Sequence, residues 1–468
     1  MHQQRHFEVA IVGGGIIGTS LLYMLSKFSD VKDILLLEKN NALAQESTNS
    51  RSNAQTLHIG DIETNYGMDK VMETKVSSML IPKYTSRLPK RERDRIIFPV
   101  RKMVLGVGDE EADFVDGRYD KKFMSMFPGI RKIGAKEIAK IEPYLMKNRD
   151  PGQSVMAAMT PNGNMVCFNL LAESFAKTAL RKNRNARISL NEGLEALKEN
   201  GDGTFELTTH KGKYTADFVV LASGGYSLYF AKAMGYGEDL SMLSVGGNFY
   251  YSRRVLNSKV YSVQKGDIPF AAVHGDPDLN HYNRTRYGPT VSVLPYLENP
   301  KDVLKGHHIR AFEEYLGAMG MDVRTIASLL NIGTNRDIMD ILALNLAYSM
   351  PEIGKYIFVK EEVNRIVPSM RNKDVTFDTE AGGVRPQIID KRKRKLVLGV
   401  VELEADGLIF DMAPSPGASS CLKGALEDAI DVTNYLGRRF NKEEFCGEFF
   451  KDEKSRRELF RSMRKPRK

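Results

Sequence analysis

The sequence has no tryptophan, few cysteines and no long apolar run. The three cysteines, Cys167, Cys421 and Cys446, are too widely spaced for a disulfide framework or a metal motif, so we expect reduced thiols and no metal site. No stretch approaches the roughly 18 consecutive apolar residues that cross a bilayer. An apolar run at 9–17 follows Arg5, but glycines interrupt it and no small-residue cleavage site comes after it. This pattern favours a strand and a turn over a signal peptide, and we expect a cytoplasmic chain.

Basic charge is distributed unevenly along the chain. The net charge is +9 over 468 residues, a length that suggests two domains. Residues 438–468 hold twelve Lys and Arg against six Asp and Glu, together with the apolar residues Phe449, Phe450, Leu459, Phe460 and Met463. A basic segment with interspersed apolar residues suits an anionic membrane surface. We predict a basic C-terminal tail at 441–468 that contacts such a surface, with a frayed, solvated tail as the alternative.

The N-terminus has the pattern of a dinucleotide-binding unit. An apolar strand is expected at 7–12, a helix at 16–28 and a second apolar strand at 34–37, which ends at Glu38. The turn carries Gly13, Gly15 and Gly18, which permit a tight bend, a close approach of a pyrophosphate and close packing of helix on strand. The carboxylate of Glu38 would accept a hydrogen bond from an adenosine ribose hydroxyl. This fingerprint alone does not separate NAD from FAD.

Strand patterns differ between the middle of the chain and its ends. A third buried strand is expected at 217–222, followed by the turn Ser223-Gly224-Gly225. Alternation at 245–251 and 290–293 indicates an antiparallel sheet, and a helical block is expected at about 308–348. The basic run 391–395 is interpreted as a solvated hairpin, with contact to anionic lipid as a further option. The absence of interleaved aromatic residues weakens the interpretation as a nucleic-acid site.

Several blocks along nearly the whole chain resemble one flavoprotein family. Besides the N-terminal unit, they are the blocks at 50–58, 63–66, 285–290, 383–387 and 415–419. They are similar to the glycine-oxidase and D-amino-acid-oxidase superfamily, and within it to the malate:quinone oxidoreductases. The resemblance implies an FAD enzyme that oxidises malate to oxaloacetate and passes the electrons to membrane quinone. It also implies a peripheral position, which we place on the cytoplasmic face of the inner membrane or an equivalent organelle membrane.

The resemblance assigns a fold class and domain ranges. We expect an α/β protein with a Rossmann-type FAD-binding domain at 1–66, 151–225 and 376–440. An interleaved substrate domain, built on an antiparallel sheet, is expected at 67–150 and 226–375. Cofactor-binding residues beyond the first turn and Glu38 are predicted in three segments: Asn53, Ala54 and Gln55 beside the flavin, Ser223 and Gly224 near the adenosine half, and Gly417, Ala418 and Ser419 at a late turn. A helix that starts at that turn would stabilise negative charge on a reduced flavin. Arg51 is a weaker candidate that would serve an FAD phosphate.

Oxidation of a 2-hydroxy acid needs a base and a carboxylate anchor. The substrate loses a hydride from C2 and a proton from its hydroxyl, and histidine suits the proton because it titrates near working pH. His58 and His274, both in matching blocks, are the candidate bases, and the sequence leaves the choice between them open. His274 is expected in a turn that follows an apolar stretch. Arg286 and Arg385 are the candidates for the carboxylates, with help from Gln387, because arginine binds a carboxylate through two parallel hydrogen bonds.

Other activities remain open at this point. L-2-hydroxyglutarate dehydrogenation is the nearest alternative, and an amino-acid oxidase is the next. A different class is a non-catalytic, basic FAD-binding module that associates with RNA. The single dinucleotide fingerprint argues against a nicotinamide acceptor, and the combination of two histidines with two arginines argues against a module without turnover.

Overall fold

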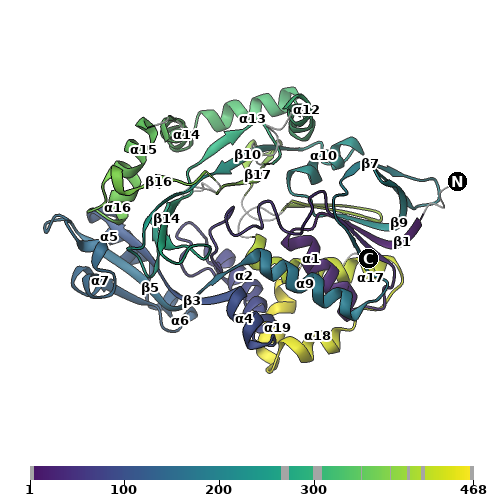
Figure 1. The fold of residues 1–468 in the computed structure, drawn as a ribbon, viewed down its shortest axis with the longest axis horizontal. Helices are drawn as coiled ribbons and strands as arrows, with labels where there is room; N and C mark the ends of the chain where they lie inside the picture. Colours follow the sequence, from purple (N-terminus) through teal and green to yellow (C-terminus); the bar gives the residue numbers. More distant parts are fainter. Residues whose placement is uncertain are drawn as a thin grey trace.

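The computed structural model describes residues 5–264, 273–298, 308–348, 350, 352–379, 381–397, 401–412 and 417–463. Three sheets organise these residues, and helices cover them on the outside (Figure 1). The mixed α/β architecture agrees with the expected fold class. Among the described residues, no helix combines the length and apolar composition needed to cross a membrane.

The first sheet contains the N-terminal unit. Its strand order is β19 (Val401–Ala405), β20 (Leu408–Met412), β9 (Gly212–Leu221), β1 (Arg5–Val12), β2 (Ile34–Leu37) and β6 (Arg187–Ser189), and β9 also pairs through β8 (Phe205–Thr209) with β7 (Leu194–Glu199). Strand β1 is parallel to both β2 and β9, so their carboxyl ends lie at one edge of the sheet. This confirms the predicted strands at 7–12 and 34–37, and the third strand ends close to the expected turn.

Helices cover both faces of this sheet. One face packs against α1 (Ile16–Phe28), α9 (Phe168–Lys182) and α17 (Gly417–Tyr435), whose apolar side chains share one core with β1 and β2. The other face packs against α10 (Gly225–Ala233) and α12 (His308–Met319). The predicted helix at 16–28 is therefore confirmed, and it is the element that presents its first turn to the edge where the parallel strands end.

The second sheet is mostly antiparallel, and it lies in the half of the molecule that does not contain the N-terminal unit (Figure 1). Its order is β16 (Thr376–Phe377), β11 (Tyr250–Arg253), β14 (Arg284–Gly288), β13 (His274–Pro277), β12 (Lys259–Ser262), β3 (Ile97–Val107), β5 (Val155–Val166) and β4 (Arg131–Gly134). Four short helices between residues 109 and 146 pack against this sheet: α5 (Asp109–Arg118), α6 (Lys121–Met126), α7 (Ala135–Ile141) and α8 (Pro143–Met146). His274 begins a buried strand here, so the expected turn at this position is wrong.

A smaller third sheet lies between the other two. Its order is β15 (Ser292–Leu294), β10 (Leu240–Gly247), β17 (Gly383–Asp390) and β18 (Lys395–Leu396), all antiparallel. The basic run 391–395 forms the turn between β17 and β18, which confirms the predicted hairpin. The predicted helical block is also confirmed, as α12, α13 (Val323–Gly333) and α14 (Arg336–Tyr348), and it continues into α15 (Ile353–Phe358) and α16 (Asn364–Ile366).

Sheet membership differs from the expected domain ranges at two places. Strand β5 falls in the range expected for the nucleotide domain, but it pairs along its length with β3 in the second sheet. Strand β17 likewise pairs with β10 in the third sheet rather than with the first. Apolar alternation identifies a strand without identifying its partner, so the chain crosses back to the first sheet only at α9. The short strands β16 and β18 also fall in the range expected for the nucleotide domain, yet they pair in the second and third sheets. The division into an FAD-binding and a substrate domain stays a prediction.

Residues 442–463 of the C-terminal segment form two helices that pack on the protein. Helices α18 (Lys442–Phe449) and α19 (Glu453–Ser462) pack beside α1, α2 (Met68–Ser78) and α3 (Leu80–Thr85), near α4 (Lys90–Ile96). Phe449, Phe450 and Leu459 are buried in the same core as α1, and Phe460 and Met463 are partly buried against it. The core of the first domain covers Phe449, Phe450 and Leu459, so these three side chains do not face a membrane. Contact of this segment with an anionic membrane surface stays a prediction.

Candidate functional site

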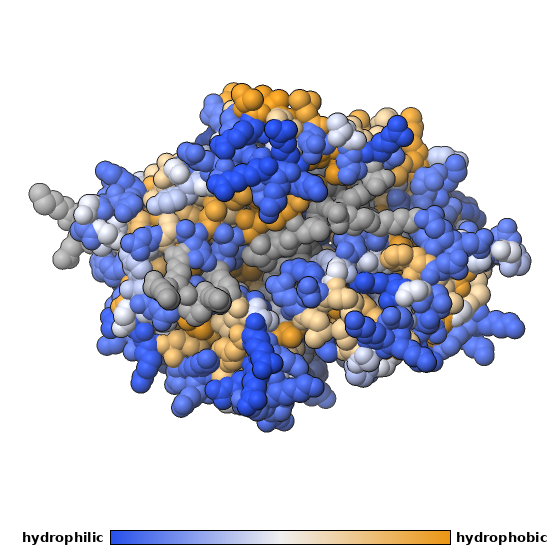
Figure 2. Space-filling model, turned by 180° about the vertical axis from the view of Figure 1, so that it is seen from behind, coloured by the Kyte–Doolittle hydropathy of each residue, from blue (hydrophilic) through white to orange (hydrophobic). Residues whose placement is uncertain are grey.

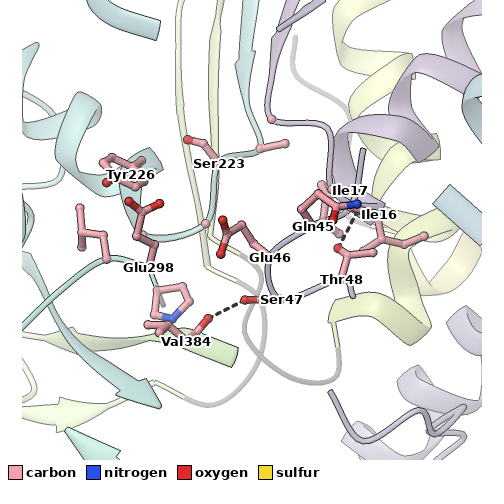
Figure 3. Close-up of a pocket in the computed structure, with 18 of the residues that line it drawn as sticks. Ile16, Ile17, Gln45, Glu46, Ser47, Thr48, Ser223, Tyr226, Glu298 and Val384 are labelled. Carbon is pink, nitrogen blue, oxygen red and sulfur yellow. Dashed lines mark hydrogen bonds between the residues drawn. The ribbon is translucent and has the colours of Figure 1, made fainter. Parts of the chain in front are cut away.

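A cavity of about 470 Å³ lies at the edge where β1 and β2 end. Segments far apart in the sequence line it: the glycine turn, the loop 44–48, the segment 53–58, the turn after β9, the start of β17 and the first turn of α17. Figure 3 shows the loop 45–48 crossing this space, where the hydroxyl of Ser47 donates to the carbonyl oxygen of Val384 at 2.6 Å. The same loop places the Thr48 hydroxyl 3.0 Å from the Ile16 backbone N–H, at the start of α1.

The three glycines of the turn meet different demands. Gly13 has a φ of +112°, and a Cβ there would lie 2.4 Å from the carbonyl oxygen of Ala222. A Cβ on Gly18 would lie 2.0 Å from the carbonyl oxygen of Gly13, so helix and strand pack directly on each other. A Cβ on Gly15 would meet only the Thr48 hydroxyl, at 3.2 Å, because this position faces the cavity. The first and third glycines therefore build the turn, and the middle one leaves room for a ligand.

Glu38 closes the adenosine end of the cavity. Its two carboxylate oxygens accept from the backbone N–H groups of Gly14, at 2.7 Å, and Asn40, at 2.8 Å. Each carboxylate oxygen can accept more than one hydrogen bond, so Glu38 also has room for a ribose hydroxyl. Ser223 and Gly224 line the same cavity, and Gly224 has a φ of +63°, which favours glycine. The glycine turn, the acidic side chain and the cavity together fit an adenine dinucleotide.

The opposite end of the cavity brings His58 to the first turn of α17. The backbone N–H of His58 donates to the Ser419 hydroxyl at 3.0 Å, and both residues line the cavity together with Gly417 and Ala418. Asn53, Ala54 and Gln55 line it on the adjacent stretch. The first turn of a helix attracts negative charge, so this end suits an anionic ring system. Residues 415 and 416 of the matching block lie outside the described residues.

His58 and Glu63 form a hydrogen-bonded pair. His58 Nδ1 lies 2.5 Å from Glu63 Oε1, and Glu63 is buried while His58 is partly exposed to the cavity. Burial raises the pKa of Glu63, but the hydrogen bond and charge of His58 outweigh it, so this pKa lies below its ordinary value. An ionised Glu63 orients the ring with its proton on Nδ1. In the described part of the chain, no side chain hydrogen-bonds His58 Nε2, which leaves that nitrogen free to accept a proton.

His274 belongs to a buried ionic cluster beneath the cavity. Its Nδ1 lies 2.5 Å from Asp276 Oδ1, and Lys259 Nζ lies 2.9 Å from the other oxygen of Asp276. Burial lowers the pKa of His274 to about 4, although Asp276 acts in the opposite direction. Burial also lowers the pKa of Lys259, to about 8. His274 is therefore neutral near pH 7 and does not line the cavity.

Tyr261 connects the two histidines. Its ring centroid lies 6.3 Å from that of His58 and 4.7 Å from that of His274. Its hydroxyl lies 2.6 Å from that of Thr56, and burial raises the pKa of Tyr261 well above its ordinary value. The structure thus brings both predicted histidines to one region, but only His58 reaches the cavity.

The two predicted arginines have different surroundings. Arg385 lines the cavity, burial lowers its pKa, and no carboxylate among the described residues forms an ion pair with it. Arg286 is fully buried and lies 3.6 Å from Asp276, and it donates to the carbonyl oxygens of Ser50 and Asn53 at 3.3 and 3.0 Å. Of the two predicted arginines, Arg385 thus faces the cavity, and Arg286 holds the segment 50–53 through its hydrogen bonds.

Two other predicted residues lie outside the cavity lining. The side-chain amide of Gln387 donates to the carbonyl oxygen of Val397 at 2.7 Å, within the β17–β18 hairpin. Arg51 is exposed at a second, polar cavity of about 280 Å³ next to Arg284 and Asp378. Neither residue is brought to the cavity with His58 and Arg385.

Sequence reasoning missed the partners of the histidines. Glu63 stands five residues after His58 in a matching block, and this spacing was the available signal. Asp276 follows His274 by two residues, so the two side chains share one face of β13, which a turn would not imply. Lys259 and Tyr261 lie on the neighbouring strand, and only the pairing of β12 with β13 brings them to the cluster.

A family model described as malate:quinone oxidoreductase matches residues 5–433. The chain belongs to this family. A probable malate:quinone oxidoreductase from Campylobacter jejuni is 36% identical over 454 residues, which cover 95% of this chain and 99% of the relative. The malate:quinone oxidoreductase of Helicobacter pylori strain 26695 is 35% identical and covers 94% and 97%. The matched region of the family model ends before α18 and α19.

Solved structures with a similar fold come from other flavoproteins. A dithionite-reduced L-alpha-glycerophosphate oxidase from Mycoplasma pneumoniae, with FAD bound, has a TM-score of 0.64 at 19% identity and covers 92% of this chain and 95% of its own. A glycine oxidase from Geobacillus kaustophilus has a TM-score of 0.61, also at 19% identity, with coverage of 92% and 95%. At this identity the likeness concerns the fold alone, and it agrees with the expected superfamily.

Proposed function

We propose that this protein is an FAD-dependent malate dehydrogenase that oxidises (S)-malate to oxaloacetate and passes the electrons to quinone. The family match over nearly the whole chain supports malate as the substrate. It favours malate over L-2-hydroxyglutarate and over amino acids. The observation that carries the proposal in the molecule itself is that His58 and Arg385 line one cavity beside a dinucleotide-binding turn: a base, and a cation that forms no ion pair with a described residue.

The residues around the cavity fit FAD. Gly15 and the first turn of α1 would hold the pyrophosphate, because backbone N–H groups at a helix start bind anions. Glu38 would bind the ribose, and Gly417 to Ser419 would face the flavin. When bound, FAD accepts the hydride from C2 of the substrate and later delivers the electrons to quinone.

His58 is the proposed general base. The proton of the malate hydroxyl moves to His58 Nε2 as C2 gives up its hydride, so that the C–O single bond becomes the carbonyl of oxaloacetate. Glu63 keeps the other ring proton on Nδ1 and stabilises the positive charge that develops on the ring. His274 is a poorer base, because its low pKa weakens its hold on a proton and it does not line the cavity.

Arg385 is the proposed anchor for a substrate carboxylate. A buried guanidinium that meets no carboxylate in the described ranges of the chain gains a strong, oriented interaction when an anion arrives. Arg286 acts as a positioning residue, since its hydrogen bonds hold the segment that precedes His58. The proposal therefore assigns one arginine to the substrate and one to the loop. Gln387, which was predicted to help bind the substrate, instead stabilises the β17–β18 hairpin through its hydrogen bond to Val397.

Anaerobic bleaching of the yellow protein tests the function directly. Purified protein is mixed without oxygen with malate, L-2-hydroxyglutarate or an amino acid, and flavin absorbance is followed. We expect malate alone to bleach the flavin rapidly, and a soluble quinone to restore the colour. Bleaching by 2-hydroxyglutarate but not malate would assign the alternative substrate. Rapid oxygen consumption without quinone would indicate an oxidase, and a colourless protein that takes up no flavin refutes the proposal.

The position in the cell is part of the proposal. A quinone acceptor resides in a membrane, so we place the protein peripherally on the cytoplasmic face of the membrane that contains it. An anionic membrane surface is the proposed partner, and nucleic acid is not. Within the described residues 442–463, the C-terminal segment offers mainly its exposed charges to such a surface, because Phe449, Phe450 and Leu459 lie in the core.

A further inference from the structure

Exposed apolar side chains gather on one run of helices. Of the nineteen large hydrophobic residues that are exposed in the described part of the chain, twelve lie between Ile309 and Tyr356. This segment comprises α12 to α15, which is a small fraction of the protein. Isolated exposed apolar residues need no explanation, but a concentration of this kind marks an interaction surface.

The spacing of these residues gives each helix an apolar outer stripe. On α12 the stripe consists of Ile309, Phe312 and Leu316. On α13 it consists of Val323, Ile326 and Leu330. Residues three or four apart lie on the same side of a helix. Val323 is 82% exposed and Leu330 is 68% exposed, whereas Thr325 and Ser328, on the opposite side of α13, are buried. Helix α13 is therefore apolar on its outer side and polar on part of its inner side.

The next two helices repeat this arrangement. On and just after α14, Met339, Leu346 and Met350 are exposed at intervals of seven and four residues. On α15, Ile353 and Tyr356 are exposed three residues apart. The four helices follow one another along one edge of the molecule (Figure 1), and the view from behind shows hydrophobic residues along the same edge (Figure 2). We call this set of outer stripes on α12–α15 the apolar edge.

The basic hairpin turn borders the apolar edge. The side-chain amide of Asn331, at the end of α13, donates to the carbonyl oxygen of Arg394 at 3.0 Å. Lys391 anchors the turn through an ion pair of 2.9 Å with Asp322, at the start of the same helix. The side chains of Arg392 and Lys393 are 76% and 79% exposed, and they form surface ion pairs with Asp239 and Asp390. Exposed cations therefore stand directly beside the outer stripe of α13.

We propose that the apolar edge and the hairpin 391–395 form the face by which the protein docks on an anionic lipid bilayer. The helices alone carry no positive excess, since residues 308–366 hold six Lys and Arg against eight Asp and Glu. The hairpin supplies the positive charge next to the apolar stripe, and this combination of cations with apolar side chains is the chemistry of an interfacial helix on anionic lipid. The inference rests on the proposed function in one respect: a quinone acceptor makes a bilayer the partner that the enzyme must meet.

This face differs from the C-terminal segment. Helices α18 and α19 lie at the edge of the molecule opposite α12 and α13 (Figure 1). One flat membrane therefore cannot contact both edges at once. Lys451, just before α19, and Lys454, on α19, provide a matched comparison, because they are exposed cations and no large apolar side chain of the described residues 442–463 is exposed beside them.

Vesicle co-sedimentation of the full-length holoenzyme tests the proposal. The vesicles contain phosphatidylcholine with phosphatidylglycerol, or phosphatidylcholine alone. We expect wild type to bind the anionic vesicles. Binding should fall about tenfold or more in Lys393→Gln/Lys395→Gln and in Val323→Glu/Leu330→Glu, since each lysine near an anionic surface contributes substantially to binding. Malate oxidation with a soluble dye should stay unchanged in both variants, while reduction of quinone embedded in vesicles should fall.

The control variant is Lys451→Gln/Lys454→Gln, which removes two exposed cations from the C-terminal segment and should bind vesicles like wild type. The proposal is overturned if this control loses binding while the hairpin variant retains it. It is also overturned if Val323→Glu/Leu330→Glu only converts a dimer to a monomer in sedimentation velocity and leaves vesicle binding intact. If wild type does not oxidise malate with the dye, the proposed function is refuted. Vesicle binding is measured separately and decides the docking proposal.

Discussion

Replacing Glu63 by glutamine removes a charge from the proposed base pair and keeps its shape. Glu63 Oε1 and His58 Nδ1 are 2.5 Å apart, and Glu63 is buried, so water cannot replace the lost interaction. A hydrogen bond to a charged group contributes about 1.5–3 kcal/mol. At about 1.4 kcal/mol for each factor of ten, this corresponds to a roughly 10- to 150-fold loss of rate. We expect the loss in kcat, with the KM for malate little changed, because Glu63 acts on His58 and not on the substrate.

The assay is steady-state malate oxidation with a soluble dye, together with the rate of anaerobic flavin bleaching in a single turnover. Glu73→Gln is the matched control, since Glu73 is an exposed glutamate on α2 that pairs only with Lys70 on the surface. Flavin content and thermal midpoint should be close to wild type in both variants. A Glu63→Gln protein that retains flavin and bleaches at the wild-type rate would falsify the assignment of His58 as the oriented base.

Three further changes test other parts of the site. Arg385→Lys should raise the KM for malate by roughly 10- to 100-fold, because lysine lacks the two-point hydrogen bonding of arginine, while Arg371→Lys on the surface should be neutral. Gly15→Ala should fold but lose flavin absorbance, because its new Cβ faces the cavity, whereas Gly18→Ala should yield little folded protein, because its Cβ meets backbone at 2.0 Å. Burial lowers the pKa of His274 from 6.5 to about 4, so the unfolded chain binds this proton more tightly. The contribution of the neutral His274 to the free energy of unfolding is thus complete above pH 6.5. About 3 kcal/mol of it is lost as the pH falls towards 4. Thermal midpoints of wild type should fall more steeply over that window than those of His274→Asn; equal slopes would contradict the burial argument.

Local sequence patterns predicted the part of the fold that depends on neighbouring residues. The glycine turn, α1 and the strands on either side of it follow from apolar runs and glycine spacing over about thirty residues. The hairpin at 391–395 and the helices at 308–348 follow from equally local signals. The family resemblance extended these predictions to the cofactor segments, and Asn53 to Gln55 and Gly417 to Ser419 do line the cavity.

The choice between the predicted site residues required the tertiary structure. His58 and His274 look equivalent in the sequence, but strand pairing buries His274 against Asp276 and leaves His58 at the cavity. Arg286 and Arg385 also look equivalent, yet Arg286 lies opposite Asp276 across two paired strands and Arg385 meets no carboxylate in the described part of the chain.

The sequence by itself determined the dinucleotide turn and the identity of most elements, because these depend on residues close together in the chain, and it determined the family through matching blocks along the chain. Tertiary packing decided which apolar side chains are covered. Phe449, Phe450 and Leu459 of the C-terminal helices lie in the core of the first domain, whereas twelve large apolar side chains between Ile309 and Tyr356 remain exposed. Both segments have the periodicity of amphipathic helices, and that periodicity specifies an apolar side without specifying what lies against it.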